Sequence, residues 1–362
     1  MSLPSPPPEN RKRKRSVEHQ PTAASHKQLK IATSTAINNT NSNNNNLGQL
    51  CWACFSKSEA ALRILLLKGG LDPNAAHGQD QSTPLHVAAT VGFLNGVDQL
   101  LQHPEVDVNK VDAHGNTAIH RAILGNNTSC LQLLLENGSR VDIQDKNGRL
   151  PIHLAALYRR SDCVSLLLSF ADHDDLMDKR TIANRTVVEE CLVGGSASIL
   201  KMLLKHILPS SRCHHHDQKE SNNNNNNNHG WIGTAVYWNR IECLKVLIEA
   251  GLDVNTPLST QDPSDTALHR AVQQRKIDMV RCLCAAKAKA CLPDGSNPPL
   301  LYAASHGFVD MIRLLITPDT SADTIRQAYL LMDTLGLADR FVNIVRARPS
   351  SSSTSSLSSP SF

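Results

Sequence analysis

The stretch STPLHVAATVGFLNGVDQLL (82–101) contains the pattern that decides the fold. Thr83 can cap a helix with its hydroxyl, and Pro84 suits the first helical position, where no backbone N–H donor is needed. Leu and Ala then recur at helical spacing until Gly92, a typical helix terminator, and a second apolar stripe follows. Helices this short are not stable alone in water, so the stretch predicts a helix pair that must pack against neighbours.

Neighbours of the same kind recur about every 33 residues along the chain. TAIH, LPIH and TALH place His120, His153 and His269 in the position of His86, and an apolar helix follows each of them. The end of the unit also returns, for example as LIEAGLDVN (247–255). Several matches in one register are a strong repeat signal. On these motifs the sequence resembles the ankyrin-repeat family.

The resemblance implies an all-α solenoid of stacked helix-turn-helix units with one projecting loop per unit. It also implies a non-catalytic protein that binds other macromolecules. In this family the matching histidine ties the turn to its neighbour by hydrogen bonds, and we expect that role here. The composition agrees, because 40% hydrophobic but only 4% aromatic residues suit helix pairs built from Leu and Ala.

Composition shifts divide the chain into four predicted regions. Residues 1–46 are rich in Pro, Ser and Asn and are expected to form a disordered basic tail. Residues 47–317 would hold about eight repeat units, with an Asn-rich insertion at 210–230 where one unit loops into the next. Two amphipathic stretches in 318–348 are expected to form a helical cap over the last unit. Residues 349–362 read as a disordered Ser-rich tail.

The positive charge is concentrated near the N-terminus. Residues 1–50 hold seven Lys and Arg against two Glu, whereas the remainder holds 30 Lys and Arg against 31 Asp and Glu. A repeat domain so close to neutral is not expected to bind nucleic acid. The basic cluster suits the binding groove of an importin, although a solubilising tail is the alternative. The predicted nuclear-import signal comprises Arg11, Lys12, Arg13, Lys14 and Arg15.

The sequence gives no sign of a membrane or secreted protein. No apolar run reaches the roughly 18 residues of a membrane helix, and residues 1–30 contain no apolar core of a signal peptide. The expected location is therefore the nucleus, the cytoplasm or both.

The ten cysteines raise the question of a metal site or disulfides. Cys130 and Cys163 each lie ten residues after their unit's histidine, at an apolar position of the second helix. Cys243 occupies the same position, so all three are interpreted as small buried hydrophobic residues. Cys51-x2-Cys54 is half of a zinc motif without a second half, and the CHHHD cluster at 213–217 has nothing to fix its geometry. We expect no metal, cofactor or catalytic site, and no enzyme activity.

Two kinds of position are candidates for partner binding. The first is the pair of residues four and five places after the histidine, where the Tyr237–Trp238 pair is unusual because packing does not require aromatic residues there. The alternative is that this pair packs beneath the Asn-rich insertion. The second kind is the loop tips. The candidates are Thr90, Val91, Leu157, Tyr158, Tyr237, Trp238, Gln273 and Gln274 on first helices, and His114, Lys146, Asn147 and Arg149 in loops.

The resemblance also suggests a modification. The pattern Leu-x5-Asp-x-Asn ends at Asn74, Asn109 and Asn255, and it is the pattern on which asparaginyl hydroxylase acts in many ankyrin domains. A structural explanation is equally available, because Asp and Asn favour the tight turn after a helix. Both interpretations can hold together.

Two rival functions remain open beside that of an interaction scaffold. A substrate-recognition subunit of a ubiquitin ligase would need a cullin-recruiting box. The segment 324–349 has a suitable length but lacks the Leu-Cys-Arg and Leu-Pro pattern of a SOCS-type box. A regulator of a transcription factor resembling the NF-κB inhibitors would fit the repeat number and the basic cluster. Against a version that is degraded on signalling, the tail contains no Asp-Ser-Gly phosphodegron.

Overall fold

The computed structural model describes residues 48–170, 177–207, 229–258, 265–288, 299–317 and 320–347. All of these belong to the unit that spans Asn46–Phe362. Several predictions concern residues outside the described ranges. They are the tails 1–46 and 349–362, the basic cluster 11–15, the cluster 213–217 and most of the Asn-rich insertion.

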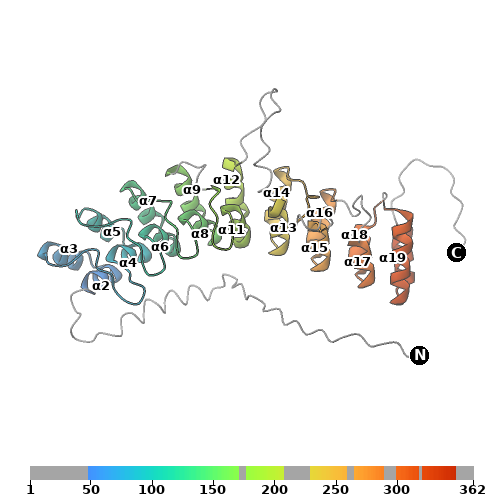
Figure 1. The fold of residues 1–362 in the computed structure, drawn as a ribbon, viewed down its shortest axis with the longest axis horizontal. Helices are drawn as coiled ribbons and strands as arrows, with labels where there is room; N and C mark the ends of the chain where they lie inside the picture. Colours follow the sequence, from blue (N-terminus) through green and yellow to red (C-terminus); the bar gives the residue numbers. More distant parts are fainter. Residues whose placement is uncertain are drawn as a thin grey trace, which may run out of the picture. The chain divides into compact units, whose positions relative to one another are not determined.

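The described chain consists of helix pairs that follow one another in sequence order (Figure 1). The first helices of units one to eight are α2 (Gln49–Phe55), α4 (Pro84–Val91), α6 (Ala118–Gly125), α8 (Pro151–Leu157), α11 (Val187–Gly194), α13 (His229–Tyr237), α15 (Ala267–Gln273) and α17 (Pro299–Ser305). The second helices are α3 (Glu59–Lys68), α5 (Leu94–Leu101), α7 (Thr128–Glu136), α9 (Ser161–Phe170), α12 (Ala197–Ile207), α14 (Ile241–Glu249), α16 (Ile277–Ala285) and α18 (Val309–Leu315).

Each helix packs on its counterpart in the next unit. The first helices contact one another in order from α2 to α17, and the second helices do so from α3 to α18. Two further helices continue the rows, because α19 (Ala322–Thr334) packs on α17 and α20 (Ala338–Arg346) packs on α18. The only β-pairing in the described residues is two isolated bridges, His77 with Ser82 and Pro257 with Thr266. The predicted all-α repeat solenoid is confirmed.

The ends of the helices follow the local chemistry of the sequence. Thr83 is the N-cap of α4 and Pro84 occupies its first turn, as predicted. Gly92 ends α4 in the left-handed conformation, with φ of 71°. Asn126 and Arg159 adopt the same conformation at the corresponding place in the next two units. The turn between the two helices of a unit thus keeps its geometry although its residue changes.

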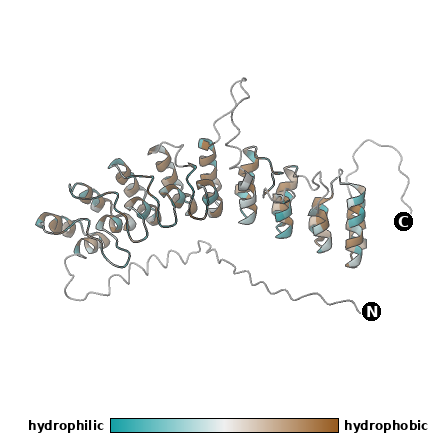
Figure 2. Ribbon diagram, in the orientation of Figure 1, coloured by the Kyte–Doolittle hydropathy of each residue, from teal (hydrophilic) through white to brown (hydrophobic). Residues whose placement is uncertain are grey.

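The core is a series of apolar layers between successive helix pairs. Hydrophobic residues are accordingly spread over all the pairs in Figure 2. Cys130, Cys163 and Cys243 are fully buried in these layers, as their register predicted. One boundary differs from the prediction, because α13 begins at His229, inside the interval 210–230 assigned to the insertion.

Candidate partner-binding surface

The loops before the first helices of units two to five are tied together by their backbones. The amide of Ala113 donates to the carbonyl of Asp80 at 2.8 Å, and that of Lys146 donates to the carbonyl of His114 at 2.9 Å. Ile182 continues the series by donating to the carbonyl of Asn147 at 2.9 Å. The loop tips therefore form one connected edge, on which the predicted residues His114, Lys146 and Asn147 are exposed.

Two glycines make this close approach between loops feasible. Gly115 has φ of 76°, and a Cβ there would lie 2.9 Å from the amide nitrogen of Lys146. Gly148 has φ of 70°, and a Cβ there would lie 2.9 Å from the amide nitrogen of Ile182. Only glycine combines this backbone conformation with so little space.

A buried aspartate anchors each of the two central loops. Asp112 accepts hydrogen bonds from the backbone amides of His114 and Asn116 at 2.8 and 2.9 Å, and it pairs with Arg121. Burial alone would raise the pKa of Asp112, but Arg121 and these hydrogen bonds hold it below its ordinary value. Asp145 holds the next loop by the same backbone contacts. The loops are therefore rigid supports for the tips.

The histidines of units two to four form a buried column of inter-unit bonds. In each, Nδ1 faces the backbone amide of the residue that precedes the helix, at 3.1 to 3.3 Å. Nε2 of His86 reaches the carbonyl of Asn116 at 2.9 Å, and Nε2 of His120 reaches that of Arg149 at 3.2 Å. His153 completes the series at the carbonyl of Lys179, at 3.1 Å. A neutral imidazole that accepts at Nδ1 and donates at Nε2 satisfies both contacts.

Burial keeps these imidazoles uncharged. It lowers the pKa of His86, and it lowers the pKa of both His120 and His153 to about 4. In unit five Glu189 occupies the histidine position. Its carboxylate accepts from the backbone amide of Thr186 at 2.7 Å, which preserves the cap at the start of α11.

Arg149 faces a buried carboxylate, whereas His114 and Asn147 contact the carboxylates of Asp80 and Asp145 from exposed positions. Its Nε lies 3.7 Å from the carboxylate of Glu190, which is fully buried in α11, and Arg185 lies 4.0 Å from the same carboxylate. Burial raises the pKa of Glu190, while the two guanidinium groups oppose that rise. Arg149 therefore joins the loop of unit four to the first helix of unit five, so little of its side chain remains for a partner.

The ends of the first helices in units six to eight carry a group of aromatic and basic side chains, of which Tyr237, Arg275 and His306 are exposed and the others half-buried. Tyr237 is 60% exposed, and its ring meets that of Trp238 edge-on with centroids 5.4 Å apart. Nζ of Lys276 donates to the carbonyls of Val236 and Tyr237 at 2.6 and 2.8 Å, which fixes the end of α13 against unit seven. Burial lowers the pKa of this lysine. A cation at a helix C-terminus is also favoured by the helix dipole.

The aromatic character continues into units seven and eight. Tyr302 stacks on His306 with centroids 4.3 Å apart, and the guanidinium of Arg275 lies 4.6 Å from the centroid of Phe308. Because α13, α15 and α17 pack in succession, these groups lie on one face. We call it the aromatic face. It comprises Tyr237, Trp238, Gln273, Gln274, Arg275, Tyr302, His306 and Phe308.

The remaining predicted first-helix residues are less accessible. Thr90 and Val91 are half-buried, and the hydroxyl of Thr90 donates to the carbonyl of His86 at 2.7 Å. Tyr158 is half-buried, whereas Leu157 is only 7% exposed. The prediction of a partner-binding role is wrong for the Leu157 side chain, because this side chain packs in the core.

The three asparagines proposed for hydroxylation lie in the turns after second helices. The side chain of Asn74 accepts from the amide of Asp107 at 2.8 Å, and that of Asn109 accepts from the amide of Arg140 at 2.8 Å. Asn255 lies in the equivalent turn, and its backbone amide donates to the Asp253 carboxylate at 2.9 Å. The side-chain amides of Asn74 and Asn109 are thus links between units, and a modifying enzyme would have to release them first. Hydroxylation of the three stays a proposal.

Sequence reasoning missed the exposed residues Ile182 and Arg275 and the half-buried Phe308. Ile182 is 77% exposed at the tip of the loop in unit five, and no periodic pattern distinguishes it. Arg275 and Phe308 were missed because they lie in the turns between the two helices of a unit, outside the two positions after the histidine and outside the loop tips. A scan of every unit's turn for aromatic and basic residues would have found them.

A family model described as ankyrin repeats (3 copies) matches most of the chain. The chain belongs to the ankyrin-repeat family. The matches extend beyond the predicted interval of 47–317 at both ends, and they cover residues 21–112, 50–145, 85–179, 125–217 and 234–327. Ankyrin repeats are in general non-catalytic modules for protein–protein interaction.

Curated relatives are similar over short segments. The p105 subunit of nuclear factor NF-κB from Gallus gallus is 34% identical over 124 residues, which are 33% of this chain and 12% of that protein. Neurogenic locus notch homolog protein 2 from Homo sapiens is 36% identical over 80 residues, 22% of this chain and 3% of that protein. A Plasmodium falciparum protein whose name places it with E3 ubiquitin-protein ligases is 36% identical over 108 residues, 27% of this chain and 1% of that protein.

This chain therefore spans only a small part of the length of the relatives it matches. Among the described residues, no helix has both the length and the apolar character needed to cross a membrane.

Proposed function

We propose that this ankyrin domain is a protein-binding scaffold whose partner docks on the aromatic face, with Tyr237 and Trp238 as its anchor. The observation that carries the proposal is the 60% exposure of Tyr237 at a position that the repeat frame does not need. Large aromatic side chains at accessible positions dominate the energy of many protein interfaces. The backbone beneath the pair is held by Lys276, so the rings are presented from a fixed support.

The charges around the aromatic face indicate which partners it favours. Residues 237–240, 273–276 and 302–308 include Arg240, Arg275 and Lys276 but no Asp or Glu. Lys276 and Arg240 donate to backbone carbonyls of the chain, so a partner with apolar and acidic groups at its surface would meet the rings and the exposed Arg275.

The test is affinity capture with the full chain and with a Tyr237→Ala/Trp238→Ala variant, followed by identification of the captured proteins. We expect the variant to lose a specific partner by at least tenfold while its melting temperature stays unchanged. The matched control is Trp52→Ala/Phe55→Ala, because these rings are also exposed and stacked, with centroids 5.9 Å apart, but lie in unit one. Equal capture by the Tyr237/Trp238 variant would contradict the proposal.

The identity of the captured protein separates three versions of this function. A Rel-type transcription factor would support a regulator resembling NF-κB inhibitors, a version favoured by the segment shared with p105. Cullin or elongin would support a ubiquitin-ligase subunit. If another protein is captured and none of these is, the result would support a general adaptor. An importin captured only while residues 11–15 are intact would support the proposed nuclear import, and its absence would contradict it.

A further inference from the structure

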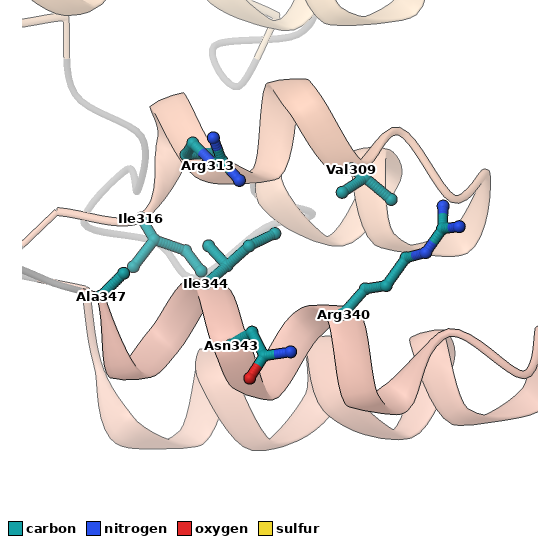
Figure 3. Close-up of a pocket in the computed structure, with 7 residues that line it drawn as sticks. All are labelled: Val309, Arg313, Ile316, Arg340, Asn343, Ile344 and Ala347. Carbon is teal, nitrogen blue, oxygen red and sulfur yellow. The ribbon is translucent and has the colours of Figure 1, made fainter.

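The row of second helices, which α20 continues, ends in a groove of about 620 Å³ between α18 and α20 (Figure 3). Ile344 lies between the two helices, and Ile316 and Ala347 close one end. Val309 and Arg340 lie at the other end. Ile316 and Ile344 are nearly buried, so they form an apolar floor. The lining is completed by Arg313 and Asn343.

The rim of the groove carries positive charge without a carboxylate. Arg313 and Arg340 are both exposed, and neither forms an ion pair with any carboxylate that the structure describes. Asp310 and Asp339 lie on the same helices but do not line the groove. Arg326 of α19, by contrast, lies 3.6 Å from Asp323. A guanidinium offers paired N–H donors that match a carboxylate, so two of them above an apolar floor favour a ligand that is both acidic and apolar.

We propose that this groove binds a short amphipathic segment of a partner protein. Its apolar side chains cover Ile316 and Ile344, and its carboxylates reach Arg313 and Arg340. On one side the groove runs along α18 from Val309 to Ile316, which directly follows the helix, a length of about 10 Å at 1.5 Å per residue that accommodates about two turns of a helix.

The segment that follows the groove in sequence does not match this ligand. Residues 348–362 contain no Asp or Glu, so they lack side-chain carboxylates that would pair with Arg313 and Arg340. The helix α20 also lies beyond residue 327, where the match to the ankyrin-repeat model ends. The groove thus joins the last matched repeat helix, α18, to a helix outside the match. It shares no residue with the aromatic face, so the variants that test the two proposals differ and the proposals can fail independently.

The experiment is selection of random 16-residue peptides displayed on phage against the full-length chain, after depletion on an Arg313→Glu/Arg340→Glu variant. We expect enrichment of net-acidic peptides with apolar residues at helical spacing. The strongest peptide, labelled for fluorescence anisotropy, should bind at least tenfold more weakly to Arg340→Glu and to Arg313→Glu. A peptide with Lys in place of its acidic residues should bind these variants better than it binds the natural chain.

Arg346→Glu is the matched control, because Arg346 is exposed on the same helix but does not line the groove. It should change binding by less than twofold. Enrichment of neutral or basic peptides, or an equal loss with Arg346→Glu, would overturn the proposal. So would binding that requires phosphoserine in place of the acidic residues. Self-association in sedimentation experiments that Arg340→Glu abolishes would assign the groove to a second copy and would likewise overturn it.

Discussion

Units two to four and units six to eight share the same repeat fold, but their polar and aromatic side chains have different roles. In units two to four the histidines bond to the next unit, and Asp112 and Asp145 hold the loops. In units six and eight Gly233 and Leu301 stand at the histidine position, and the exposed positions nearby carry aromatic and basic residues. Where the sequence agrees with the repeat, its polar side chains are occupied by the frame. Where it departs, side chains are left for a partner.

The largest expected difference between the two regions is their response to acid. His120 and His153 have a pKa of about 4 in the folded chain, against an ordinary value near 6.5. The unfolded chain therefore binds protons first, and stability is lost as the pH falls from about 6.5 to about 4. Each histidine contributes on the order of 3 kcal/mol to this loss. Urea denaturation at pH 7.5 and pH 4.5, followed by hydrogen exchange, should show units two to four opening first.

A variant isolates the histidine contribution to this acid response. Glu190 titrates in the opposite sense, because burial raises its pKa, so acid relieves part of its penalty. His120→Gln removes one imidazole and should flatten the dependence of the unfolding free energy on pH, although it lowers that free energy at pH 7.5. If the natural chain and the variant lose stability equally between pH 6.5 and 4, the column is not the acid-sensitive element.

Removal of one buried histidine tests the frame directly. His120→Ala deletes the contacts with Thr117 and with the carbonyl of Arg149 and leaves a cavity, so we expect a loss of about 3 kcal/mol in the unfolding free energy. His306→Ala is the matched change in the other region. His306 is exposed and outside the column, so its loss should be below about 0.5 kcal/mol. Comparable losses in urea denaturation would contradict the division between frame and surface.

A smaller loss of stability distinguishes Arg149 from Lys146, two loop residues that the sequence analysis assigned to the same partner-binding group. Arg149→Ala removes one of the two guanidinium groups that lie within 4.0 Å of the buried Glu190 carboxylate in the described residues, and we expect a cost of about 2 kcal/mol. Lys146→Ala, at the exposed tip of the same loop, should cost less than about 0.5 kcal/mol. Thermal denaturation of the two variants checks the difference. A larger loss for Lys146→Ala would show that the tip, and not the buried pair, holds the loop.

The fold was predictable because one short sequence pattern determines the ends of a helix by local rules and then repeats along the chain. Thr83, Pro84 and Gly92 specify a short helix by local rules, and the recurrence of His86 specifies the stack. The register also predicted the burial of Cys130, Cys163 and Cys243. These are properties that a single unit carries in its own residues.

The surface was predictable only in part, because exposure depends on what the neighbouring units place beside a residue. Leu157 and Tyr237 occupy equivalent positions, yet one is 7% and the other 60% exposed. Arg149 was predicted to be at a free tip, but it faces a carboxylate contributed by the following unit. The groove at Arg313 and Arg340 joins two helices of dissimilar sequence, so no repeat register could reveal it.

The smallest expected effect on stability decides what the aromatic pair does. Tyr237→Ala should change the unfolding free energy by less than about 1 kcal/mol, because its ring is mostly in solvent and touches little beyond Trp238. Val236, its neighbour in α13, is fully buried, so Val236→Ala should cost about 2 kcal/mol. Urea denaturation of both variants gives the ratio of their losses in unfolding free energy.

If Tyr237→Ala costs as much as Val236→Ala, the ring is packed against another part of the chain, which would support the alternative that it packs beneath the Asn-rich insertion. If it costs little, an exposed aromatic side chain persists on a rigid helix without a stabilising role. The natural reason for such a residue is contact with another protein.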